Sequence, residues 1–216
     1  MLLSEPAVRP TTGRGPVVLF ALLVLACLGR LAFTIWEGPF DGSISVADAA
    51  RPGLWPMNLY LGAPSYIVSF VAVAVFLVVL GRASVLSVVA GALVGLGGIV
   101  FGLVINAEVL PFVYAVDPAV LPAADGAELV AALDDRLDLL LPTILGSSAV
   151  IALGAVLGLV ATALARTAPR WFAPAALAGV VVAQLLPQVG LVAVGYVLDL
   201  AVIVGIGWFG MRVART

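Results

Sequence analysis

The sequence predicts an all-α, polytopic membrane protein: a bundle of six transmembrane helices with both termini in the cytoplasm and a short amphipathic helix outside. Three observations predict this class. The 216-residue chain is 63% hydrophobic and only 10% charged, with a mean hydropathy of +1.25, whereas a soluble domain is about 45–50% apolar. Its apolar residues form stretches long enough to cross a bilayer. Its arginines fall between these stretches in an alternating pattern.

Six stretches are expected to cross the membrane, because about 20 apolar residues span roughly 30 Å of hydrocarbon in a helix. They are residues 16–36, 60–80, 84–106, 141–165, 171–187 and 190–211. The last two come from one apolar block that is too long for a single crossing. A turn over residues 186–190 divides it, since Pro187 and Gly190 favour an interruption of the helix.

The arginines orient these spans, because cytoplasmic loops carry an excess of Arg and Lys while acidic residues have little influence. With six spans, residues 1–15 and 212–216 are cytoplasmic tails. The arginines that then lie inside are Arg9, Arg14, Arg82, Arg166, Arg170, Arg212 and Arg215. Five spans would place Arg212 and Arg215 outside, so six spans are preferred. Ten acidic residues fall in the outer loops, 37–59 and 107–140.

The basic residues are all arginine, and the chain has no histidine and a single cysteine, Cys27. Together with the Ala, Val, Gly and Leu bias, this composition indicates a bacterial plasma-membrane protein. Without histidine, a b-type haem and a His-dependent catalytic triad are excluded. One cysteine allows no intramolecular disulfide and no thiolate cluster. We therefore expect no metal site, no cofactor and no disulfide.

The segment that ends at Cys27, Val24-Leu25-Ala26-Cys27, loosely resembles a bacterial lipoprotein processing site. The apolar sequence continues to Trp36, however, whereas a cleaved signal has about 7–15 apolar residues. A retained first helix is therefore expected, and lipidation of Cys27 stays an alternative. Either reading places the next loop outside.

The first outer loop is rich in glycine and proline and is expected to be compact and full of turns. Ser45 and Asp48 fit a capping box for a short helix over residues 46–50. Trp55 and Tyr60, with the apolar residues between them, fit an interfacial belt. A ligand-binding aromatic site is the alternative for this belt.

The second outer loop is expected to hold an amphipathic helix that begins at Asp125 with Asp125 and Glu128 as its N-terminal cap. Leucines at helical spacing form its apolar face: Leu129, Leu133, Leu137 and Leu140. Asp134, Asp135 and Asp138 fit a solvated acidic face. The alternative, a calcium or magnesium site, lacks the expected glycine-punctuated ligand loop.

Glycines at GxxxG spacing occur in two apolar stretches, and a Gly-Ala pair at the same spacing occurs in a third. They are Gly91 with Gly95, Gly98 with Gly102, Gly154 with Gly158, and Gly179 with Ala183. Small residues at this spacing allow helices to approach closely. Their spread over several stretches favours packing within one bundle over homodimerisation.

Polar residues within the spans gather in the outer half. Arg30 and Asp199 are expected at similar depths, which allows them to pair. The other members of this group are Asn106, Glu108, Gln184, Gln188 and Tyr196. One interpretation is a structural salt bridge that closes the bundle, because an unpaired ion is costly in a membrane. The others are an outward-facing ligand pocket and a proton-coupling role for Asp199.

No pattern of catalytic residues emerges, so we expect a non-catalytic protein. The first hypothesis is an accessory or assembly factor that binds a membrane-protein partner through its outer loops and helix faces. The second is a small carrier or binder of a hydrophobic or cationic compound. A membrane enzyme that acts on a lipid is a further, less favoured alternative. Nucleic-acid binding is not expected, because the arginines lack a domain to organise them.

Overall fold

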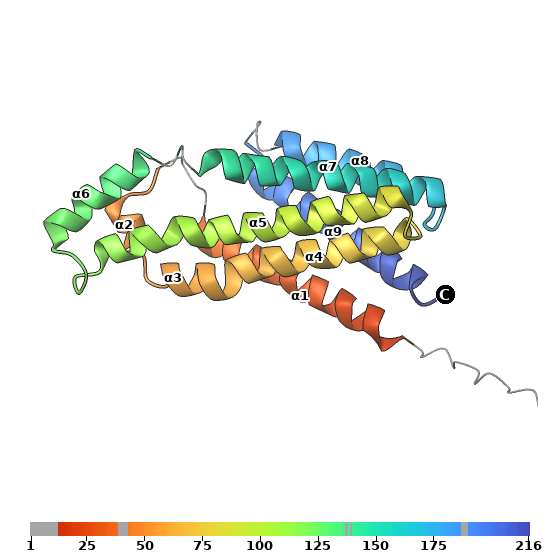
Figure 1. The fold of residues 1–216 in the computed structure, drawn as a ribbon, viewed down its shortest axis with the longest axis horizontal. Coiled ribbons are helices and arrows are strands. Elements are labelled where there is room, and N and C mark those ends of the chain that lie inside the picture. Colours follow the sequence, from red (N-terminus) through yellow and green to blue (C-terminus); the bar gives the residue numbers. More distant parts are fainter. Residues whose placement is uncertain (1–12, 39–42, 137, 139, 187–189) are drawn as a thin grey trace, which may run out of the picture.

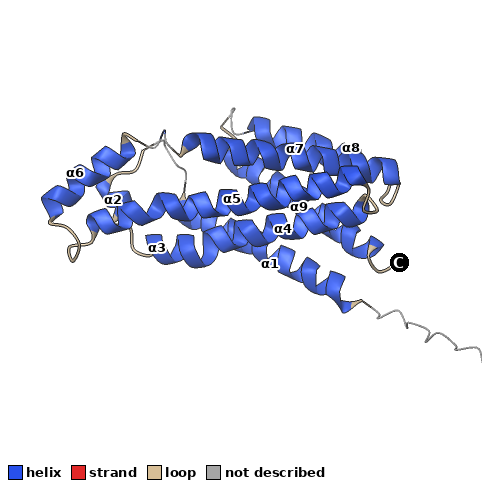
Figure 2. Cartoon of the chain, in the orientation of Figure 1, coloured by secondary structure: helices blue, strands red, loops and turns tan. Residues whose placement is uncertain are grey.

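The computed structural model describes residues 13–38, 43–136, 138, 140–186 and 190–216. Within these residues every regular element is a helix (Figure 2). Five helical segments there are long and apolar enough to cross a membrane: Arg14–Glu37, Leu54–Leu80, Val85–Val116, Leu141–Ala165 and Val192–Val213. These apolar helices agree with the predicted all-helical membrane class.

The predicted division of the last apolar block is present, because α8 (Phe172–Leu185) and α9 (Val192–Val213) are separate helices. The central turn residues, 187–189, lie outside the described residues. At 14 residues, α8 is about 21 Å long, which is shorter than the roughly 30 Å hydrocarbon core. Length alone therefore supports five crossings, and α8 is a shorter apolar helix beside them.

Five long helices and the shorter α8 lie side by side along the longest axis of the molecule (Figure 1). They are α1 (Arg14–Glu37), α4 (Ala63–Leu80), α5 (Val85–Val116), α7 (Leu141–Ala165), α8 and α9. The short α2 (Val46–Ala49) and α6 (Ala123–Asp134) lie at one end, here called the outer end. The start of α1, the α4–α5 and α7–α8 turns and the C-terminus lie at the other, the inner end (Figure 1).

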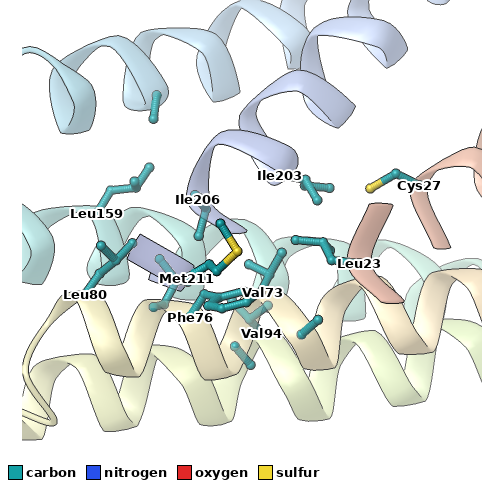
Figure 3. Close-up of a cluster of buried hydrophobic side chains, with 14 of the residues drawn as sticks. Leu23, Cys27, Val73, Phe76, Leu80, Val94, Leu159, Ile203, Ile206 and Met211 are labelled. Atoms are coloured by element: carbon teal, nitrogen blue, oxygen red, sulfur yellow. The ribbon is translucent and has the colours of Figure 1, made fainter. Parts of the chain in front are cut away.

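A hydrophobic core joins these six helices, α8 included. It includes Leu23 and Cys27 of α1, Phe76 of α4, Leu159 of α7 and Ile206 of α9. Figure 3 shows these side chains together with Met211. The helix α1 runs without interruption past Cys27, whose side chain is buried.

Glycines on α5 and α7 allow close contacts between helices. A Cβ on Gly98 would lie 2.3 Å from the Cβ of Phe70, and one on Gly154 would lie 2.9 Å from the carbonyl oxygen of Ala90. Gly91 and Gly102 likewise approach α4. The prediction that these glycines pack helices within the chain is confirmed.

The expected turn-rich segment before residue 64 is helical from Leu54 onwards, so this part of the loop prediction is wrong. Here α3 (Leu54–Pro56) leads into a π-helix, η1 (Met57–Gly62), which continues as α4. Pro64 has no N–H and its ring crowds the carbonyl four residues before it. We attribute the wide π-helical turn to this proline, since the N–H of Ala63 bonds to the Asn58 carbonyl, five residues back.

The third apolar stretch also extends further than expected, since α5 continues to Val116 through the residues assigned to a loop. Pro111 lies within it. The helix persists because Phe112 and Ala115 are buried against Ala49 of α2 and Val130 of α6, and this burial outweighs the hydrogen bond lost at the proline.

The outer helix α6 begins at Ala123 after Pro122, without a side-chain cap, so the predicted Asp125 cap is wrong. Its buried residues are Gly126 and Val130. Leu129 is 37% exposed, and Leu137 lies outside the described residues. Leu133 packs against the small core around Val130, so the predicted leucine face is buried only in part. Gly126 sets the closest contact, because a Cβ there would lie 2.0 Å from the Ala115 carbonyl oxygen.

The capping box of the short helix α2 is confirmed. The Asp48 N–H donates to the Ser45 hydroxyl, and the Ser45 N–H donates to the Asp48 carboxylate. These reciprocal bonds satisfy two backbone donors that a four-residue helix leaves free.

Candidate functional site: a caged ion pair

Arg30 and Asp199 form an ion pair between α1 and α9, with 3.2 Å between Nη2 and Oδ2. Arg30 is seven residues before the end of α1, and Asp199 is seven residues after the start of α9. Each therefore lies about 10 Å from the outer end of its helix. The two charges meet at the same depth, which joins the first helix to the last.

Aromatic rings surround the Arg30 guanidinium. Its Cζ lies 4.5 Å from the ring centroid of Tyr66, 5.0 Å from that of Phe70 and 5.6 Å from that of Tyr196. A further hydrogen bond runs from Nη1 to the Ser69 hydroxyl at 3.4 Å. Cation–π contacts of this kind partly replace the hydration that a buried arginine loses.

The helix α4 positions most of this cage. Tyr66, Ser69 and Phe70 have i, i+3, i+4 spacing, so they share one face of the helix. The ring of Phe101 on α5 lies 5.2 Å from that of Tyr66 and 6.4 Å from that of Phe70. Gly98 gives Phe70 the room to occupy this position. These α4 residues were missed by the sequence analysis, although Tyr66 and Ser69 are polar groups within an apolar span.

Among the residues that the structure describes, three buried polar atoms in the outer half make no hydrogen bond of normal geometry. They are Nε of Arg30, the hydroxyl of Tyr196 and Oδ1 of Asn106. The Asp199 side chain is 32% exposed, whereas that of Arg30 is 4% exposed. The ion pair is thus closed on the arginine side and accessible on the carboxylate side.

The other predicted members of the group lie elsewhere. Glu108 on α5 is electrostatically coupled to Glu37, the last residue of α1, and Arg51 lies beside Glu37. Gln184 is exposed on α8, and Gln188 lies outside the described residues. The structure therefore brings together Arg30, Tyr196 and Asp199, and it places Glu108 in a second group nearer the outer end.

Comparisons with protein-family models, with curated proteins and with solved structures find no match. The site must therefore be interpreted from its own geometry. In the described part of the chain, no three His, Cys, Asp or Glu side chains come together as metal ligands. Two cavities lie at the inner end, one beside Arg166 and one beside Arg14.

A second set of contacts builds the outer cap, which we define as α2, α6 and the end of α5 from Phe112. Arg51 donates to the Glu37 carbonyl at 2.7 Å, pairs with Asp48 at 3.2 Å and lies 5.5 Å from the Trp36 ring centroid. The Ile44 N–H donates to the Asp134 carboxylate at 2.6 Å. These contacts fix the cap to the end of α1.

The hydrogen bonds from Ser45 lower the pKa of Asp48 below its usual value, and Arg51 beside it acts in the same direction. The negative charge is favoured because all these donors stabilise the ionised carboxylate. Asp48 therefore remains ionised under neutral conditions and can serve both the capping box and the contact with Arg51.

Proposed function

We propose that the chain is a non-catalytic, six-span protein of a bacterial plasma membrane that acts as an accessory or assembly factor, with a membrane-protein partner bound at its outer cap. Both termini lie in the cytoplasm in this proposal. The observation that carries it is the enclosure of the ion pair: Arg30 is held by Asp199, Ser69 and aromatic rings of its own chain. Because the Arg30 guanidinium already fills the aromatic cage, the arrangement favours a structural role over catalysis.

The outer cap is the part of the molecule best suited to recognition. It has its own small core and is tied to α1 through Arg51. Three acidic residues on α6 and directly after it, Asp125, Glu128 and Asp135, are exposed. A rigid, charged surface favours specific pairing with a complementary partner.

Native mass spectrometry of the protein extracted gently from its own membrane tests this proposal. The expected result is a stoichiometric protein partner, whose amount falls when Asp125, Glu128 and Asp135 are replaced together by Asn, Gln and Asn. The matched control removes three exposed inner-end charges, with Arg82, Arg212 and Arg215 each replaced by Gln. Absence of any partner, or equal loss in the control, would contradict a partner at the outer cap.

A binder of a hydrophobic or cationic compound is the second candidate, because the buried oxygens of Asn106 and of Tyr196, the latter beside Arg30 and Tyr66, form no hydrogen bond of normal geometry with the described residues and lie in the same half of the bundle as the partly exposed Asp199 carboxylate. Such a compound would bind to these two oxygens and to the Asp199 carboxylate. Mass spectrometry of the same sample distinguishes the two candidates: this one predicts a small molecule that is retained by the wild type and lost in Asp199→Asn.

A further inference from the structure

A cavity of about 210 Å³ opens at the inner end of the bundle, between the last turn of α7 and the first turn of α8. Arg166 and Arg170 line it, together with Thr162 and Ala173. Both arginines are exposed. Among the residues that the structure describes, neither arginine forms an ion pair and no carboxylate lines the cavity. Two cations thus share a hollow that contains no counter-charge from the described chain.

The loop that carries both arginines is fixed in place by contacts of its intervening residues. The Thr167 hydroxyl donates to the Leu80 carbonyl at the end of α4, and the Phe172 N–H donates to the Pro169 carbonyl at 2.9 Å. Ala168 packs against the hydrophobic core. The arginine backbone is therefore ordered before any ligand arrives, which lowers the entropy cost of binding.

Arg166 occupies a backbone conformation that does not suit an arginine. It ends α7 with a φ of +53° in the left-handed region, where helices usually have glycine because a Cβ is unfavourable there. The arginine side chain lines the cavity despite this cost. Arg82 and Ala83 share this backbone conformation, so it is the place of Arg166 at the cavity wall, and not its φ, that supports a role in binding.

The chemistry of the cavity fits a phosphate group. Guanidinium groups bind phosphate oxygens through paired hydrogen bonds. Ala173 places the first turn of α8 at the cavity wall, and the N-terminal end of a helix carries partial positive charge. Trp171, which is 64% exposed beside this site, suits the membrane interface.

The short α8 favours a lipid as the source of that phosphate. At about 21 Å, the helix does not match the hydrocarbon thickness, and such mismatch draws headgroups towards the helix end. We infer that this cavity binds the phosphate of an anionic phospholipid, held between Arg166 and Arg170. The inference requires that the helices lie in a bilayer and is independent of the proposed accessory role.

Lipid titration of the delipidated, full-length protein in neutral detergent tests the inference, with native mass spectrometry and thermal unfolding as readouts. The probes are phosphatidylglycerol, phosphatidylcholine and inorganic phosphate. We expect one retained phosphatidylglycerol and a higher melting temperature, with little effect of the other two. The variant Arg166→Gly with Arg170→Gln should bind phosphatidylglycerol about 30-fold more weakly, the loss of two surface cations. It should remain folded, since glycine suits a φ of +53°.

The matched control is Arg82→Gln with Arg212→Gln, which removes two exposed arginines at the same end but away from the cavity. It should keep most of the affinity for phosphatidylglycerol. Equal weakening in both double variants would overturn the inference, because binding would then depend on overall charge. Equal stabilisation by inorganic phosphate would overturn the assignment to a lipid. Equal retention of phosphatidylcholine would overturn the role of anionic charge.

Discussion

At the scale of single residues, the ion pair explains why a charge is retained within an apolar bundle. Moving a guanidinium out of water costs several kcal/mol, and here the cost is offset by a carboxylate, a hydroxyl and aromatic faces from α4 and α9. Because these groups come from α4 and α9 while Arg30 lies on α1, the arrangement exists only when all three helices are assembled. The contacts of Arg30 therefore form only when the bundle is correctly closed.

Replacement of Asp199 by Asn should destabilise the protein by about 2–3 kcal/mol. A buried pair that loses one partner loses about 3–5 kcal/mol, and we expect a smaller loss here because the Asp199 side chain is only partly buried, with 32% of it exposed. The measurement is unfolding of both proteins in the same detergent. The double variant Arg30→Met with Asp199→Leu should recover most of the loss, since no unpaired ion remains. Unchanged stability of Asp199→Asn would contradict a structural pair.

The Ser45 and Asp48 capping box should make α2 sensitive to acid. The folded-state pKa of Asp48 lies below its usual value of 3.8, so its contribution to stability is complete above that value and is lost as the pH falls through the lower, folded-state pKa. Amide exchange of residues 46–51 measures this change. Asp48→Asn should show weaker protection at neutral pH and little further change with acid. An acid response in that variant equal to the wild type would contradict the assignment to Asp48.

At the scale of helices, burial and close approach decide the ends and faces more than local sequence signals do. The apolar lengths, the capping box of α2 and the small-residue packing of α5 were predictable, because each depends on residues close in sequence. The course of α5 past Pro111 was not predictable, because it depends on contact with α2 and α6. The buried face of α6 was not predictable either, because it depends on the close approach of Gly126 to Ala115.

The candidate site was predictable only in part for the same reason. Arg30 and Asp199 are identifiable as charges within apolar stretches, and their depths follow from helix rise. The cage is harder to predict, since Tyr66 and Phe70 are ordinary residues of an apolar helix until α1 packs against them. Asn106 and Glu108 were grouped with the pair by depth alone, whereas Glu108 lies on a helix that places it near Glu37.

Gly126→Ala tests the attachment of the outer cap. The new Cβ would lie 2.0 Å from the Ala115 carbonyl oxygen, a backbone atom of α5, so α6 must move away at a cost of about 1–3 kcal/mol. Amide exchange should show loss of protection in α6, with α4 and α7 unchanged. The control is Gly146→Ala on α7, where a Cβ meets nothing within 4 Å. Equal effects of the two substitutions would contradict the close contact.

At the scale of the whole molecule, charge divides the chain into two ends. The inner end carries the exposed arginines Arg14, Arg82, Arg166, Arg170, Arg212 and Arg215. Most of the described acidic residues lie at the outer end, on α2, on α6 and after α5. Because positive residues stay in the cytoplasm, this division favours an orientation with the arginine-rich end inside. It also places the proposed lipid site and the proposed partner surface on opposite sides of the membrane.

The helix α8 decides the topology, since among the described apolar helices it alone is shorter than the hydrocarbon core. If α8 crosses the membrane with its flanking residues, the loop 166–170 and the C-terminus lie on the same side. If it does not, Arg212 and Arg215 lie opposite Arg166 and Arg170, against the orienting effect of arginine. We therefore predict that residue 216 and the loop 166–170 are both cytoplasmic and that residues 117–122 are outside.

Paired reporters measure this topology: one folds only in the cytoplasm and the other only outside it. Each is fused after Thr216 or inserted after Thr167 or Ala119, and membrane-inserted protein is quantified in each case. The cytoplasmic reporter should be active at the first two positions and the external reporter at the third. Arg212→Glu with Arg215→Glu should weaken the cytoplasmic signal at Thr216, because the positive residues that hold this end inside are removed. External activity after Thr216 in the wild type would establish five crossings and place α8 on one side of the bilayer.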